Sequence, residues 1–132
     1  METKMIWGNF ASSDLEKTRD FYSDLGFVFN GTHSTDENAS FIFGQNKFII
    51  NFFKKAVLKD ETNGGIGNWE SQSEIIFSLS AESEEEVDQW YEKVHTIGGK
   101  IISEPQPYKE GYTFCFSDPD GHKFNVLYWQ GM

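Results

Sequence analysis

The sequence predicts an α+β fold in which two βαβββ modules form a half-open curved mixed sheet around an inner cup. The main observation is an internal repeat. Phe21 and Trp90 lie 69 positions apart, each on an apolar helical stripe, and the serines that precede the two helices, Ser13 and Ser83, lie 70 apart. A chain of 132 residues is long enough for one domain, so 1–132 is expected to be a single domain made of both modules.

Module one is expected to span about 1–58. Ser13 and Glu16 have the spacing of a capping box, so a helix is predicted from Ser13 to a stop at Gly26. Alternating apolar residues before and after this helix predict four strands. They are expected at 6–11 and near 26–32, 39–44 and 47–53.

Module two, at 74–132, repeats this order of elements. Ser83 and Glu86 form a second capping-box spacing, and a glycine pair at 98–99 ends the helix. Strands are predicted at 74–80 and near 99–103, 112–117 and 123–129. The polar, glycine-rich stretch at 59–73 is predicted to be a loop that links the modules, and whether it closes over a site stays open.

The last two strands flank the tight turn Asp118-Pro-Asp-Gly121, a strong signal for a β-hairpin. Cys115 lies in the first of these strands with phenylalanines on both sides, and it is the only cysteine. An intramolecular disulfide is therefore impossible, and the thiol is interpreted as a small strand residue.

The composition restricts the partners and the cellular location. The formal net charge of −10 disfavours nucleic acids and anionic membranes, and it favours cationic ligands or serves solubility alone. Aromatic residues make up 17% of the chain, enough to build a core and to line a cavity. No signal segment or membrane-spanning run is evident, so a cytoplasmic protein is expected.

Three segments resemble the glyoxalase/bleomycin-resistance/dioxygenase proteins, the vicinal oxygen chelate superfamily. They are the helix segment Asp14–Phe27, the helix segment Glu84–Val94 with the Gly98–Lys100 and Glu104–Pro105 that follow, and the turn Ser117–His122. More narrowly, the chain is similar to small proteins labelled predicted lactoylglutathione lyases. The resemblance implies paired βαβββ modules, a ligand-binding cup and a symmetric homodimer.

Metal-dependent members of this superfamily place one metal ligand on each of four inner strands. Carried over by resemblance, these positions fall on Trp7, at or near Asn51, on Glu74 and on Asn125, with Asn9 a weak oxygen donor beside Trp7. Indole nitrogen has no lone pair for a metal, and amides lack the charge of the carboxylates they replace. No metal or other cofactor is therefore predicted. The three histidines, His33, His95 and His122, are expected to be surface or turn residues.

The favoured hypothesis is a small-molecule binder that holds a cationic or aromatic ligand without a transition metal, as the resemblance to bleomycin-resistance proteins implies. The residues predicted to bind the ligand are Trp7, Asn9, Asn51, Phe53, Glu74, Asn125 and Leu127. Glu74 is also the candidate catalytic residue, because desolvation in the cup would raise its pKa toward that of a general base. The alternatives are a metal-dependent lyase, isomerase or dioxygenase that uses Glu74, and an interaction module whose cup is filled by its own side chains.

Overall fold

The computed structural model describes residues 1–63, 67 and 75–131. Its contacts divide the chain into two compact units, Met1–Gly67 and Asn68–Met132, and each unit is described by itself. Glu74, to which the sequence assigned both a binding and a catalytic role, lies outside the described residues, so that assignment stays a prediction.

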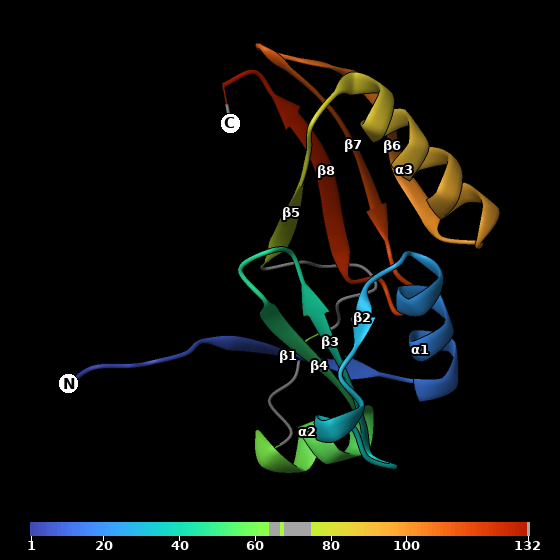
Figure 1. Cartoon of the computed structure of the whole chain (residues 1–132). Helices are drawn as coiled ribbons and strands as arrows, with labels where there is room; N and C mark the ends of the chain where they lie inside the picture. The colour runs from blue at the N-terminus through green and yellow to red at the C-terminus, as the bar shows by residue number, and fades with distance from the viewer. Residues whose placement is uncertain (64–66, 68–74, 132) are drawn as a thin grey trace. The chain divides into compact units, whose positions relative to one another are not determined.

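The first unit is a four-stranded sheet with helices (Figure 1). The strand order is β1-β4-β3-β2, in which β1 and β4 run parallel and the other neighbours run antiparallel. The elements are β1 (Trp7–Ser12), α1 (Leu15–Asp24), β2 (Val28–Phe29), the 3-10 helix η1 (Gly31–His33), β3 (Asn38–Phe43), β4 (Phe48–Lys54) and α2 (Lys55–Glu61).

The second unit repeats this topology in its described part, with the order β5-β8-β7-β6 and the same parallel first pair. Its elements are β5 (Ile76–Ala81), α3 (Glu84–Thr96), β6 (Lys100–Tyr108), β7 (Gly111–Ser117) and β8 (Lys123–Trp129). The α+β class and the repeated βαβββ order are therefore confirmed, and both sheets are open.

Aromatic side chains fill the space between α1 and its sheet. Tyr22 of α1 is fully buried and stacks on Phe52 of β4, with 4.5 Å between ring centroids. Phe41 and Phe43 of β3 lie 5.7 and 5.8 Å from the same ring. Offset and edge-to-face ring pairs of this kind add to the free energy gained from burial. These contacts identify the sheet face that carries Phe41, Phe43 and Phe52 as the face covered by α1.

The second core has the same arrangement with a different ring set. Tyr91 of α3 meets Phe114 of β7 edge-on at 5.7 Å. Phe114 stacks on Phe116, which stacks on Phe124 of β8, at 5.7 and 5.5 Å. All three phenylalanines are buried. The sheet face that packs on α3 is therefore apolar and shielded from solvent at these three rings.

The structure corrects four local predictions. The strand predicted near 26–32 is confined to Val28–Phe29, and the 3-10 helix η1 follows at Gly31–His33. The side chain that caps α1 belongs to Asp14, which accepts a hydrogen bond from the N–H of Lys17, and not to Ser13. The predicted loop at 59–73 begins inside a helix, because α2 continues to Glu61. Strand β6 extends beyond the predicted end at 103 as far as Tyr108. The predicted cap of α3 is confirmed, since Ser83 accepts from the N–H of Glu86 at 3.1 Å.

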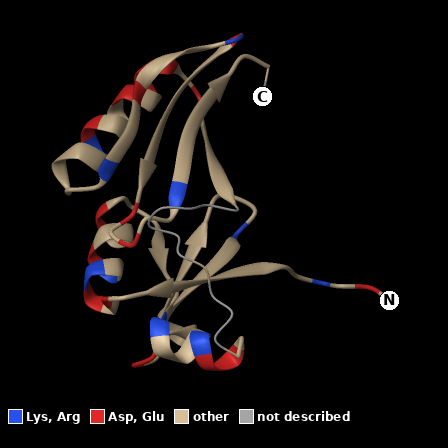
Figure 2. Cartoon of the chain, turned by 180° about the vertical axis from the view of Figure 1, so that it is seen from behind, with Lys and Arg blue, Asp and Glu red and all other residues tan. Residues whose placement is uncertain are grey.

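Acidic residues are concentrated on the helices, whereas the strands of both sheets are largely uncharged (Figure 2). Glu84, Glu85 and Glu86 form the first turn of α3, where negative charge interacts favourably with the helix dipole. Among the described helices, none is both long and apolar enough to cross a membrane.

Candidate functional site

Each sheet packs one face on a helix, α1 in the first unit and α3 in the second, and we call the opposite face the open face. On the first open face, Asn38 and Ser40 of β3 are buried beside η1. Because side chains alternate along a strand, the residues between the buried phenylalanines lie on the open face. These are the faces on which the sequence placed its candidate binding residues.

Two asparagines lie side by side on the first open face. Asn9 of β1 is the register partner of Asn51 of β4, which in turn pairs with Ser40 of β3. The Asn51 side chain donates a hydrogen bond from Nδ2 to Oδ1 of Asn9 at 3.4 Å. Ser40 accepts from Nδ2 of Asn30 at 3.2 Å. We call Asn9, Asn51 and Ser40 the first polar row.

A matching row crosses the second open face. Ser78 of β5, Asn125 of β8 and Cys115 of β7 occupy one register line, and we call them the second polar row. The Ser78 hydroxyl donates to Oδ1 of Asn125 at 2.6 Å, and Nδ2 of Asn125 donates to the Thr113 hydroxyl at 3.3 Å. Thr113 donates onward to the carbonyl of Val126 at 2.7 Å. These bonds fix which way the Asn125 amide points.

The other predicted binding residues that the structure describes flank these rows. Trp7 is 52% exposed and lies on the first open face beside Ile49, its register partner. Phe53 follows Asn51 on the same face of β4, and Leu127 follows Asn125 on the same face of β8. Each open face therefore combines amide groups with apolar neighbours.

The donors in the two rows do not match the ligands of a transition metal. The described residues of the rows supply amide oxygens, hydroxyl groups and one thiol, whereas these ions prefer imidazole, thiolate or carboxylate ligands. In the described part of the chain, no group of three His, Cys, Asp or Glu residues could hold a metal ion.

The Cys115 thiol lies in the middle of the second sheet and is half-buried. Burial raises its pKa, and the positive charge of Lys123 opposes that shift. A thiol with a raised pKa is a poor nucleophile at neutral pH. Cys115 is therefore better suited to contact a ligand than to react with one.

The closing turn of the second unit is tightly bonded. Oδ1 of Asp118 accepts hydrogen bonds from the N–H groups of Asp120 and His122, both at 2.9 Å. Beside this turn lies a pocket of about 590 Å³ whose described lining includes Lys100, Ser117 and Lys123. This pocket adjoins the open face, because Ser117 is the register partner of both lysines.

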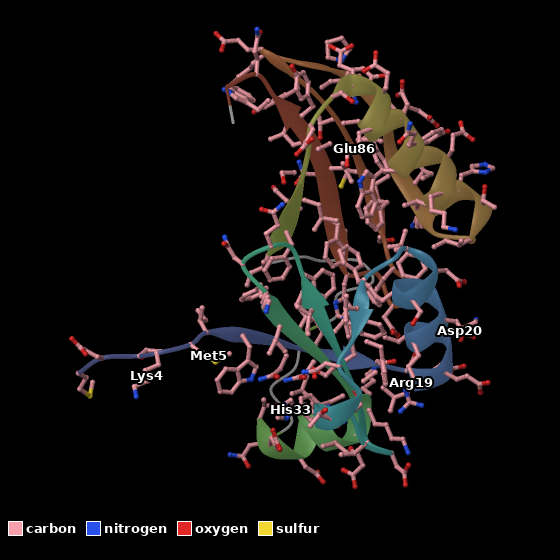
Figure 3. The ribbon with its side chains drawn as sticks, in the orientation of Figure 1. Lys4, Met5, Arg19, Asp20, His33 and Glu86 are labelled. Carbon is pink, nitrogen blue, oxygen red and sulfur yellow. The ribbon has the colours of Figure 1, made fainter. Side chains whose placement is uncertain are left out.

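The histidines lie off the two rows. His33 belongs to η1 and is exposed, as Figure 3 shows. His95 is exposed on α3. His122 follows the closing turn, as predicted, but is only 4% exposed.

Sequence reasoning missed Ser78, which the structure places directly opposite Asn125. A signal for it was present, because Ser78 lies 69 positions after Asn9, the same interval that separates Phe21 and Trp90. The resemblance directed attention to Glu74, four positions before Ser78. The repeat interval would have identified the serine.

Paired βαβββ units with polar rows on their open faces define the structural class of this protein. A family model described as the Glyoxalase/Bleomycin resistance protein/Dioxygenase superfamily matches residues 7–126. The chain belongs to this superfamily, as its sequence resemblance indicated.

Several solved structures share this fold. A hypothetical protein from S. aureus is 30% identical, with 97% of this chain and 95% of that chain covered and a TM-score of 0.86. A glyoxalase/bleomycin resistance protein/dioxygenase family enzyme from Burkholderia phytofirmans is 17% identical, with coverages of 92% and 95% and a TM-score of 0.78. The fosfomycin resistance protein FosX from Listeria monocytogenes is 18% identical, with coverages of 99% and 97% and a TM-score of 0.72. No curated protein matches the chain.

Proposed function

We propose that this protein binds a small organic molecule on its open sheet faces through direct hydrogen bonds to amide and hydroxyl groups, without a transition metal. The observation that carries the proposal is the second polar row, where Asn125 is held between Ser78 and Thr113. An amide oriented in advance loses little conformational entropy when it binds a ligand.

The hydrogen-bonding capacity of Asn125 supports this role. Its amide has two N–H donors and two lone pairs on oxygen, and the two bonds to Ser78 and Thr113 use one of each. One N–H and one lone pair therefore remain for a ligand. Asn51 has a similar arrangement in the first unit, where its Nδ2 donates to Asn9. Planar molecules with an adjacent donor and acceptor fit such groups.

The apolar neighbours support the aromatic part of the expectation. Trp7 is largely exposed beside the first polar row, and Leu127 flanks the second. An aromatic face next to an amide edge would select flat molecules with a polar rim.

The test is a screen of small metabolites and aromatic antibiotics by thermal shift, followed by calorimetric titration of each hit. Asn125→Leu removes the N–H donors and the oxygen acceptor of the side-chain amide at similar volume. Asn46→Leu, in the exposed turn before β4, is the matched control. We expect Asn125→Leu to weaken binding about tenfold, as the loss of one or two net hydrogen bonds implies, and Asn46→Leu to have no effect. A panel without any hit, or hits indifferent to Asn125→Leu, would refute the proposal.

A second candidate is a metal-dependent lyase, isomerase or dioxygenase of the same superfamily that uses Glu74. The observation in its favour is a relative, the FosX protein from Listeria monocytogenes, one structure of which is described as a complex with Mn(II) and sulfate. Elemental analysis of protein purified without chelator tests this candidate. Substoichiometric metal, with no binding of added Mn²⁺, Ni²⁺, Zn²⁺ or Fe²⁺, would eliminate it.

We also propose that the protein is a symmetric homodimer in the cytoplasm. Open sheets leave edge strands, which proteins usually cover or pair. The described edge strand β2 exposes Val28 and Phe29, which suits coverage by a partner. A monomer mass in solution scattering would refute the dimer.

A further inference from the structure

The second open face carries two aromatic rings at the end farthest from the closing turn. Tyr108 of β6, Gly111 of β7 and Trp129 of β8 occupy one register line there. Trp129 is four residues beyond Asn125 on β8, so the two side chains are on the same face of the strand. We call Tyr108 and Trp129 the aromatic pair.

The glycine between the two rings makes room for them. The ring centroids of the aromatic pair are 6.4 Å apart, and the ring planes are inclined by 58°. A Cβ on Gly111 would lie 3.2 Å from Cε3 of Trp129, so the indole occupies the space above the middle strand that another side chain would fill. A cross-strand aromatic ring that covers a glycine in this way supports a sheet. This packing uses the side of the indole that faces the backbone.

Part of the aromatic pair remains in contact with solvent. Tyr108 is 48% exposed and Trp129 is half-buried. Tyr108 already has a cation beside it, because the Lys109 ammonium lies 5.5 Å from its ring centroid. In the described part of the chain, Tyr108 is the only ring that pairs with Trp129. The positive charge of Lys109 disfavours a second cation at this end, so an uncharged ring is the group that fits it best.

The open face changes from polar to aromatic along β8. Asn125 belongs to the second polar row, Leu127 follows it, and Trp129 ends the strand. Leu127 pairs with Ser80 on one side and Thr113 on the other, so small side chains flank it on its register line. Alternate residues of a strand are about 7 Å apart, which puts about 14 Å between the polar row and the aromatic pair. Because the side chains themselves cover part of this distance, a molecule of two linked rings with a polar group at one end can touch both.

The polar end of this surface offers mainly hydrogen-bond acceptors. The Ser78 hydroxyl donates its only proton to Oδ1 of Asn125 at 2.6 Å, so it meets a ligand as an acceptor. Ser78 is exposed, and Oδ1 of Asn125 keeps a second lone pair beside it. A ligand group that pairs with these acceptors must carry an N–H or O–H donor.

We propose that the second open face binds an elongated, uncharged aromatic molecule. Its terminal ring lies against Trp129 and Tyr108, and its middle part lies over Leu127. An amide or similar group at its other end donates an N–H to Ser78 and accepts from Asn125. This inference rests on the proposed small-molecule function and specifies the shape and class of the ligand. It also assigns Trp129 and Tyr108, which the sequence did not indicate, as specificity-determining residues.

Four uncharged probes that differ in one feature at a time test the proposal. Para-phenylbenzamide has both the amide and a terminal ring, benzamide lacks the terminal ring, para-cyclohexylbenzamide has a saturated one, and para-acetylbiphenyl has no N–H. Each is titrated into the ¹⁵N-labelled full chain, with the amide signals of 78–80, 108–113 and 125–129 and the indole N–H signal of Trp129 as the readout. We expect para-phenylbenzamide to bind about tenfold more tightly than benzamide, and about fivefold more tightly than the cyclohexyl probe or the ketone.

Variants of the aromatic pair locate the terminal ring. Trp129→Leu should weaken binding of para-phenylbenzamide about tenfold, remove its advantage over the cyclohexyl probe and leave benzamide unchanged. Tyr108→Leu, at the exposed end of the β6–β7 hairpin, should weaken it about threefold, and it keeps the test valid if Trp129→Leu disturbs the strand. Phe29→Leu removes an exposed ring from β2 of the first unit, and as the matched control it should have no effect. Ser78→Ala should weaken the amide probes about threefold and leave the ketone unchanged.

The outcomes separate this inference from the proposed function. If the phenyl and cyclohexyl probes bind equally, or both variants of the aromatic pair bind para-phenylbenzamide normally, the aromatic end is wrong. If the ketone binds as tightly as the amide, the N–H at the polar end is wrong. If the probes shift only signals of the first unit, or shift none, the whole inference fails. The metabolite screen, with its dependence on Asn125, then decides the proposed function by itself.

Discussion

Replacing Asp118 by alanine tests whether the closing turn is held by a side chain or by its backbone alone. In the native turn one carboxylate oxygen accepts the N–H groups of Asp120 and His122 at 2.9 Å. Alanine keeps the backbone bonds of the turn, from Asp118 N–H to the His122 carbonyl and from Gly121 N–H to the Asp118 carbonyl. The substitution therefore isolates the contribution of the side chain.

The expected cost follows from burial. Asp118 is 3% exposed, so two N–H groups would lose their acceptor where water has little access. An unsatisfied buried donor costs about 1–3 kcal/mol, and partial entry of water beside the exposed Pro119 reduces the sum. We expect Asp118→Ala to lower the free energy of unfolding of the second unit by about 2–4 kcal/mol. Asp118→Asn keeps an acceptor oxygen, so its free energy of unfolding should fall by no more than half as much as that of Asp118→Ala.

Urea unfolding followed by circular dichroism and by the amide signals of Phe124–Val126 measures this change. Asp20→Ala on α1 removes the same charge from an exposed position, labelled in Figure 3, and should stay within about 0.5 kcal/mol of wild type. The reasoning fails if Asp118→Ala is as stable as Asp20→Ala. It also fails if Asp118→Asn is as destabilised as Asp118→Ala, since the loss would not then depend on the acceptor oxygen.

Two further predictions concern the second sheet. A Cβ at Gly111 would clash with the carbonyl oxygen of Tyr128, so Gly111→Ala must shift the β7–β8 pair and should cost about 1–3 kcal/mol in urea unfolding. Gly67→Ala, with no described atom within 4 Å of its Cβ, should be neutral. An equal effect of both substitutions would refute the steric argument. The Tyr112 hydroxyl donates to Asp88 at 2.9 Å, which raises the pKa of Tyr112, so its stabilising contribution holds below the pKa of the unfolded chain and is lost as pH rises through the folded pKa. Absorbance at 295 nm should therefore show tyrosine ionising at higher pH in the folded than in the urea-unfolded protein, and Asp88→Asn should shrink that lag; an unchanged lag would contradict the assignment.

Much of the fold was predictable because its signals are local. The hairpin at 118–121, the cap of α3 at Ser83 and the glycine at the end of α1 each depend on residues within one turn. The repeat interval added the long-range order, since the same sequence of elements specifies the same topology twice. Local signals failed where two neighbouring residues could both cap a helix, or where no side chain marks the start of an element.

Three of the errors illustrate these cases. Ser13 and Asp14 can both cap a helix, and the structure uses Asp14, whose own N–H bonds to the hydroxyl of Ser12. Helix α2 starts at Lys55 after Lys54, whose side chain makes no capping hydrogen bond, so nothing in the sequence marks its beginning. Strand β6 contains Pro105 and Pro107, which argue against a strand unless it is an edge strand, and β6 is one.

The site was harder to predict because its residues are paired by register across strands that are distant in sequence. Asn51 and Asn125 were found through their resemblance to ligand positions. The repeat interval from Asn9 marks Ser78 in the sequence, but its pairing with Asn125 is seen only once β5 is aligned with β8. A shift of one residue would move Ser78 to the helix face. Register depends on the packing of the whole sheet, which sequence spacing alone does not determine.

The repeat also explains how one topology can carry two different surfaces. The helix faces of both sheets are constrained by close packing around Tyr22 in one unit and Phe114 in the other, so they must stay apolar. The open faces are more exposed, and their residues differ between the two units. The first carries Trp7 beside its amides, whereas the second carries Lys123 and a hydroxyl group at Ser78. The equivalent register pairs, Trp7–Ile49 and Ile76–Lys123, thus place an aromatic ring on one open face and a lysine on the other. Specificity in this chain is therefore expected to reside in the differences between the two open faces and not in the features that they share.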